Sequence, residues 1–182
     1  MENIHRITCL TNTINLLQAS GSNPIIILIC DCSSKGSYIS GINAKLANLY
    51  IYAHPYKNRT KRAIPGTIEF FRDPNSQNSP VFCTFNIQIY PGGPNYDRDT
   101  YIDRLRWFRQ CLEQLKKNTI NTLVFPYKFD QKLSEVTWNR YLNILYSWQQ
   151  TLTNKCSILI LDSHFAVSQY EFLINKNSAI LS

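Results

Sequence analysis

Side chains that could take part in chemistry gather directly after the most apolar run of the chain, Ile25–Cys30. The first of them, Asp31, is a carboxylate at the end of a stretch typical of a buried strand. It can serve as a base or bind a ribose hydroxyl, and it can equally cap its own turn by accepting hydrogen bonds from Ser33 or Ser34. The sequence leaves both roles open.

Two later segments carry polar side chains that would meet Asp31 if the strands are parallel. Asn86 and Gln88 alternate along one run, and Tyr127–Phe129 follow another. The carboxyl ends of parallel strands share one edge of a sheet, and α/β folds bind their ligands there. We therefore predict a ligand cleft formed by Asp31, Ser33, Ser34, Gly36, Ser37, Tyr38, Gly41, Asn86, Tyr127, Lys128 and Phe129. Asp31 is its candidate catalytic group.

No motif in the chain identifies an enzyme by itself. HExxH, GxSxG and a phosphate-binding glycine run followed by Lys are all absent from the sequence. Cys30 and Cys32 flank Asp31, but further zinc ligands would have to come from scattered Cys and His side chains. We expect neither a metal nor a cofactor, and the question of enzymatic activity stays open.

The elements that would position these side chains alternate between strands and helices. The uninterrupted β-branched run Ile25–Cys30 is typical of a strand buried on both faces of a parallel sheet. The other predicted strands are Ile4–Leu10, Thr67–Phe71, Val81–Tyr90, Thr122–Phe125 and Ser157–Leu161. Both Ile25–Cys30 and Thr122–Phe125 are expected in the interior of the sheet.

Helices are predicted from apolar spacing and capping residues. Thr11–Thr13 can cap a helical turn over 14–18, and a second helix lies within 37–50. Asp99 is expected to cap a helix that runs to Lys117, and Thr137 to cap one over 138–152. The core stripe of the third helix would be Ile102, Leu105, Phe108, Leu112 and Leu115.

Composition fits one globular domain. The 182 residues are 44% hydrophobic and carry a net charge of +7, which suits an anionic ligand or a nucleic acid. A basic and aromatic stretch that could bind nucleic acid includes Tyr52, Tyr56, Lys57, Arg59, Lys61, Arg62 and Arg72. This partner is not favoured, since no Lys/Arg run is longer than Lys116–Lys117.

The cysteines and the start of the chain predict a location inside the cell. Met1–Arg6 does not resemble a signal peptide, and no apolar run approaches the roughly 20 residues of a membrane span. We expect a cytoplasmic or nuclear protein in which Cys30, Cys83, Cys111 and Cys156 are buried and reduced.

Three segments together resemble the macrodomain, the ADP-ribose-binding α/β/α module, and are closest to divergent viral and microbial members. They are Ile29–Lys45, Phe85–Pro94 with its Tyr-Pro-Gly-Gly-Pro, and Arg104–Tyr141 with Phe125-Pro126-Tyr127 and Trp138-Asn139-Arg140-Tyr141. The resemblance implies a three-layer α/β/α fold with a mixed, mostly parallel central sheet over residues 1–165. Residues 166–182 would form a C-terminal arm or tail.

The positions that hold ADP-ribose in that family differ here. Asn12 and Thr13 stand where an adenine-binding Asp is usual, and no Asn occurs over 31–33 for the distal ribose. The second phosphate loop, 128–137, contains no glycine, although backbone amides approach a diphosphate closely only where Cβ atoms are missing. We predict binding of ADP-ribose weaker than about millimolar, since each lost charged contact costs about 1.5–3 kcal/mol.

Three functions follow from the resemblance and its departures. The first is a macrodomain-like module that acts through a different nucleotide-type ligand or through a protein surface. The alternative is a hydrolase of ADP-ribose conjugates or of a nucleotide signal, with Lys35 and Lys128 on phosphate. The second alternative is a nucleic-acid-binding domain.

Overall fold

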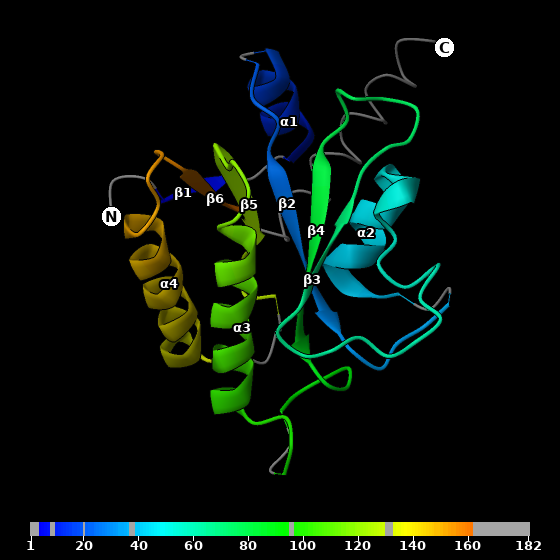
Figure 1. Ribbon diagram of the computed structural model, residues 1–182, viewed down its shortest axis with the longest axis vertical. Coiled ribbons are helices and arrows are strands. Elements are labelled where there is room, and N and C mark those ends of the chain that lie inside the picture. The colour runs from blue at the N-terminus through cyan, green and yellow to red at the C-terminus, as the bar shows by residue number, and fades with distance from the viewer. Residues whose placement is uncertain are drawn as a thin grey trace, which may run out of the picture.

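A six-stranded sheet forms the centre of the protein (Figure 1). The computed structural model describes residues 4–7, 10–19, 21–36, 39–94, 97–129 and 133–161. The strand order is β1-β6-β5-β2-β4-β3. Every pairing is parallel except that of β3 with β4. The strands are β1 (Ile4–Ile7), β2 (Ile25–Asp31), β3 (Ile68–Phe71), β4 (Val81–Gln88), β5 (Thr122–Pro126) and β6 (Ser157–Leu161).

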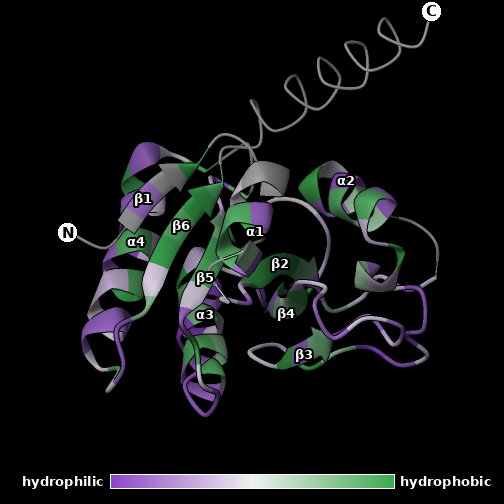
Figure 2. Ribbon diagram, turned by 90° about the horizontal axis from the view of Figure 1, so that it is seen from above, coloured by the Kyte–Doolittle hydropathy of each residue, from purple (hydrophilic) through white to green (hydrophobic). Residues whose placement is uncertain are grey.

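Helices cover both faces of this sheet, as Figure 2 shows. The helices are α1 (Leu10–Ala19), α2 (Gly41–Leu49), η1 (Ile51–Ala53), α3 (Tyr101–Leu115) and α4 (Glu135–Gln150). Alternate residues of β2 belong to two separate cores. Ile27 packs with residues of α3 and α4, whereas Leu28 packs with Ile14 of α1 and Leu46 of α2. The predicted three-layer α/β/α fold with a mixed, mostly parallel sheet is confirmed, as are the interior positions of β2 and β5.

The helix starts differ from those predicted. Thr100 caps α3, and its side chain accepts a hydrogen bond from the Asp103 amide. Asp99 is used elsewhere, in a buried ion pair. Ser134 caps α4 in place of Thr137, and α1 already includes 11–13. Neighbouring Ser, Thr and Asp residues all suit an N-cap, so the pattern alone cannot choose among them.

The prediction that Ile102 belongs to the core stripe of α3 is wrong. Ile102 is 76% exposed, whereas Leu105, Phe108, Leu112 and Leu115 are buried. At 3.6 residues per turn, Ile102 lies about 120–140° around α3 from the buried Phe108 and Leu115, so its side chain faces away from the sheet.

The predicted burial of the thiols is confirmed. Cys30, Cys32, Cys83, Cys111 and Cys156 are all buried and none forms a disulfide. Burial raises the pKa of Cys30 and Cys32 to about 12 and that of Cys156 to about 11. These groups are therefore neutral thiols near neutral pH.

Within the described ranges, no three His, Cys, Asp or Glu side chains lie close enough together to hold a metal ion. Among the helices described by the structure, none has the length and apolar character needed to cross a membrane. The predicted arm over 166–182 lies outside the described residues.

Candidate functional site

A cleft of about 320 Å³ lies at the carboxyl edge of the sheet. The end of β2 contributes Asp31, and the first turn of α2 contributes Gly41 and Asn43. Gly92 of the loop after β4 and Phe129 of the loop after β5 complete the walls. Sequence segments far apart in the chain thus meet where parallel α/β sheets bind ligands.

Asp31 is buried in a complete set of hydrogen bonds. It is 4% exposed. Its Oδ1 accepts from the Ser33 amide at 2.9 Å, the Ser33 hydroxyl at 3.0 Å and the Ser34 amide at 2.6 Å. Its Oδ2 accepts from the Tyr56 hydroxyl at 3.0 Å. The carboxylate therefore caps the turn that follows β2 and supports the floor of the cleft, the second of the two roles that the sequence allowed.

The segment after η1 holds this turn in place through hydrogen bonds. The Arg59 guanidinium donates to the Asp31 carbonyl at 2.7 Å and to Asn86 Oδ1 at 2.9 Å, and it lies over the Tyr56 ring. The Gly36 amide donates to the Tyr56 carbonyl at 3.0 Å. Burial, followed by Cys30 and Asp31, raises the pKa of Tyr56, so its hydroxyl stays protonated and donates to Asp31.

The open end of the cleft is the start of α2. Gly41 adopts a left-handed φ of 61°, and a Cβ there would meet nothing within 4 Å. The Ser40 side chain makes no capping hydrogen bond, and the first turn holds no acidic residue. Asn43 Nδ2 donates to the Ile29 carbonyl at 2.8 Å, but its buried Oδ1 meets no donor in the described part of the chain. Uncapped amides and the positive end of the helix dipole favour an anionic ligand at this end.

The opposite end is filled by the loop after β5. Phe129 lines the cleft while its ring packs against Phe125, Trp138 and Tyr141, with centroids 5.0 Å apart for Tyr141. Lys128 forms an ion pair with Glu135 of α4, and hydrogen bonding to Glu135 raises the pKa of Lys128. Its φ of 37° places a non-glycine residue in the left-handed region. This part of the cleft is therefore formed by the side chains of the loop and not by glycine amides.

A buried ion pair holds the loop after β4. Arg104 Nε donates to Asp99 Oδ1 at 2.6 Å and Nη2 to Oδ2 at 2.8 Å, and both residues are nearly inaccessible. Arg104 Nη1 also donates to the Gly92 carbonyl at 3.0 Å, and Asp99 Oδ2 accepts from the Ile89 amide at 3.1 Å. The pair thus fixes the wall of the cleft that contains Gly92.

The structure places only some residues of the predicted site in the cleft. Asp31, Ser34, Gly41 and Phe129 line the cleft. Asn86 does not, because its side chain binds Arg59 and Thr67.

Four more of the predicted residues have other contacts. Ser33 bonds to Asp31, Gly36 bonds to the Tyr56 carbonyl, Tyr127 packs against Trp138, and Lys128 pairs with Glu135. Ser37 and Tyr38 lie outside the described residues.

Sequence reasoning missed several residues of the site. Tyr56 and Arg59 were assigned to a nucleic-acid surface, but they turn inward and support Asp31. Asn43 and Gly92 line the cleft. The position of Asn43 in the first turn of the helix after Asp31 was the available signal.

Comparisons with known proteins agree on the fold. No family model and no curated protein matches the chain. Among solved structures, the macrodomain of Thermus aquaticus DarG is similar, with a TM-score of 0.57 and 12% identity over 87% of this chain and 97% of that one. The macrodomain of Mycobacterium tuberculosis DarG has a TM-score of 0.51 and 14% identity over 76% and 88%.

A third solved structure, a point mutant of the Oceanobacillus iheyensis macrodomain, has a TM-score of 0.52 and 12% identity over 84% of this chain and 86% of that one. The chain therefore has the macrodomain fold, as the resemblance implied. Identities this low speak for the fold alone.

Proposed function

We propose that the protein is a binding module of the macrodomain type whose cleft takes the phosphate end of a mononucleotide, without hydrolysing it. The macrodomain fold supports a ligand related to ADP-ribose. The shape of the cleft supports a smaller one, since its volume of about 320 Å³ is at the low end for ligand pockets.

One observation carries the proposal, namely the contrast between the two ends of the cleft. The start of α2 is uncapped and lined by Gly41, so amides can approach a phosphate. At the other end, Phe129 is held by the aromatic cluster and Lys128 by Glu135. A diphosphate in the usual family position would need the space of these side chains.

The alternative functions have less support from the contacts. A hydrolase would need a base, but each Asp31 oxygen already accepts hydrogen bonds from protein groups. A nucleic-acid surface would need accessible aromatic rings, but Tyr56 is 6% exposed and the Tyr52 hydroxyl donates to the Pro80 carbonyl.

Calorimetric titration with adenosine monophosphate, ADP-ribose and inorganic phosphate tests the proposal. We expect adenosine monophosphate to bind with a dissociation constant below about one millimolar and ADP-ribose to bind more weakly than that. Micromolar binding of ADP-ribose that Asp31→Ala or Lys128→Ala abolishes would restore the hydrolase. Absence of binding by all three probes would leave a protein surface as the function.

Two glycine variants form a matched pair for this test. Gly41 and Gly21 both have left-handed φ values, 61° and 76°, and open space around a new Cβ. Gly41→Ala and Gly21→Ala should therefore lose similar stability, on the order of 1–2 kcal/mol. Only Gly41→Ala should weaken binding of adenosine monophosphate, because Gly41 lines the cleft and Gly21 does not.

A further inference from the structure

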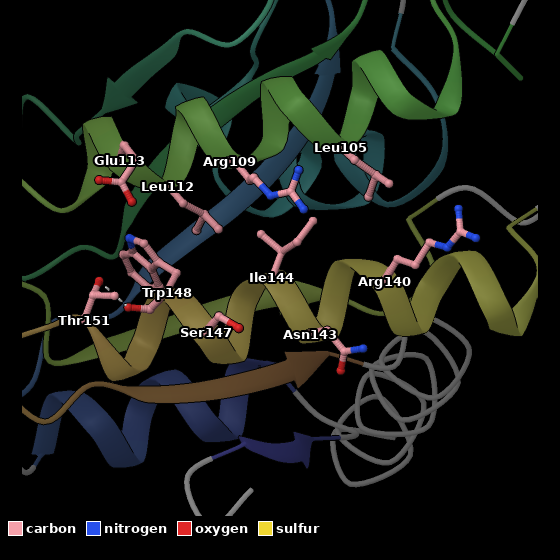
Figure 3. Close-up of a pocket in the computed structure, with 10 residues that line it drawn as sticks. All are labelled: Leu105, Arg109, Leu112, Glu113, Arg140, Asn143, Ile144, Ser147, Trp148 and Thr151. Atoms are coloured by element: carbon pink, nitrogen blue, oxygen red, sulfur yellow. Dashed lines mark hydrogen bonds between the residues drawn. The ribbon is translucent and has the colours of Figure 1, made fainter.

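A groove of about 610 Å³ lies between α3 and α4, away from the cleft (Figure 3). We call it the α3/α4 groove. Its floor is apolar and consists of Leu105, Leu112, Ile144 and Trp148. The residues that line it differ from those that line the cleft, so the proposed binding of a mononucleotide leaves this surface unused.

The length and direction of the groove suit a helix. α3 connects β4 to β5, and α4 connects β5 to β6. These three strands are parallel, so the two helices run in the same direction. The groove follows α4 from Arg140 to Thr151, a length of about 16 Å at about 1.5 Å per residue. Roughly three turns of a third helix would cover this length and bury the apolar floor.

The rims of the groove are mainly basic. Arg109 on α3 and Arg140 on α4 lie on opposite rims, as Figure 3 shows, and both are exposed. Neither forms an ion pair with a described residue. Among the described residues that line the groove, Glu113 is the only acidic one. An occupant with acidic side chains on both sides of an apolar stripe would therefore find a cation on each rim.

We propose that the α3/α4 groove binds an acidic amphipathic helix of another protein. The apolar stripe of that helix packs on Leu105, Leu112 and Ile144, and its carboxylates pair with Arg109 and Arg140. The net charge of +7 attracts the same partner over longer distances and raises the rate of encounter.

A second copy of the chain is a poorer occupant. Each copy brings two rim arginines and one rim glutamate, so a dimer through this groove would place one positive surface against another. A nucleic acid is also a poorer occupant, because its bases need exposed rings to stack on, and Trp148 in the floor is 4% exposed.

Fluorescence anisotropy with two labelled peptides tests this binding on the full chain. Both peptides, of roughly 15 residues, carry leucines at positions i, i+3, i+4 and i+7 of a helix. One has glutamates on both sides of this stripe, and the other has lysines at the same positions. We expect the acidic peptide to bind at least about tenfold more tightly than the basic one. Equal binding of the two peptides, or no binding of the acidic one, would overturn the proposal.

Charge reversal on the rims localises the binding. In Arg109→Glu/Arg140→Glu the preference should reverse, so that the basic peptide binds at least about tenfold more tightly than the acidic one. A gain of binding cannot arise from unfolding, which makes this readout independent of a loss of stability. An unchanged preference for the acidic peptide would show that it binds elsewhere.

The matched control is Arg62→Glu/Arg72→Glu, which changes the net charge by the same amount. Arg62 and Arg72 are exposed and do not line the groove. This variant should keep the preference for the acidic peptide, and a reversal here as well would reduce the effect to net charge and overturn the proposal. Sedimentation of the native protein should show a monomer. A dimer that Arg109→Glu/Arg140→Glu dissociates would instead assign the groove to a second copy.

Discussion

Asp31 illustrates how a carboxylate in a cleft can serve the fold. We predict that Asp31→Asn lowers the free energy of unfolding by about 1.5–3 kcal/mol, the range for hydrogen bonds to a charged group. The amide nitrogen cannot accept from the Tyr56 hydroxyl, so two donors would face each other where Asp31 Oδ2 now accepts at 3.0 Å. Urea unfolding of both proteins measures the difference.

Asp73→Asn is the matched control for that variant. Asp73 accepts from the Asn75 amide at 2.9 Å and from the Ser79 hydroxyl at 3.0 Å, but it is only half-buried. Water can replace its lost bonds, and the loss should stay below about 1 kcal/mol. Equal losses in the two variants would contradict a special role for burial at Asp31.

The buried ion pair between Arg104 and Asp99 should contribute far more to the free energy of unfolding than a surface ion pair. We predict that Arg104→Met costs about 3–5 kcal/mol, because it leaves the buried Asp99 carboxylate without its partner. Arg106→Met removes a partner of Asp103 from a pair whose arginine side chain is 61% exposed, and should cost less than about 1 kcal/mol. Thermal and urea unfolding would show the contrast, and similar losses would refute it.

At the scale of helices and strands, the start of α4 offers two candidate N-cap residues, Ser134 and Thr137, which mutation can distinguish. Ser134 Oγ accepts from the Thr137 amide at 3.2 Å, so Ser134→Ala should cost about 0.5–2 kcal/mol of stability. Thr137 lies inside the helix, and Thr137→Ala should cost less than half as much. A larger loss for Thr137→Ala in urea unfolding would show that the helix starts later than the structure indicates.

The helices and strands also show what could be predicted from the sequence. Runs such as Ile25–Cys30 and Ser157–Leu161 were predicted as strands because apolar, β-branched residues require burial on both faces. The first residue of each helix could not be predicted in the same way, since several adjacent residues can serve as the N-cap. For the site, the pattern located the loop after β2, but it could not show that Tyr56 and Arg59 would fold back onto Asp31. Such contacts depend on the path of a loop, which has no periodicity.

At the scale of the whole molecule, the buried thiols predict a loss of stability at alkaline pH. Burial raises the pKa of Cys30 from 9.0 to about 12 and that of Cys156 from 9.0 to about 11. Between these values the unfolded chain ionises first, and the folded state binds more protons. Stability is therefore full below about pH 9 and falls as the pH rises toward 11–12.

Urea midpoints measured at about pH 8 and pH 10.5 would reveal this fall. Cys156→Ala removes one of the contributing thiols, so its midpoint should fall by less over the same interval. A midpoint that does not move in the native protein would contradict the burial of these groups.

The position of β6 between β1 and β5 affects how the chain is made on the ribosome. β1 is synthesised first, yet its partner β6 is the last strand described, at Ser157–Leu161. Until that strand emerges, the β5 edge has no partner on one side, and an incomplete chain exposes backbone groups that can pair with other nascent chains. Translation that stops before residue 157 would thus yield a product prone to aggregation rather than a smaller working domain.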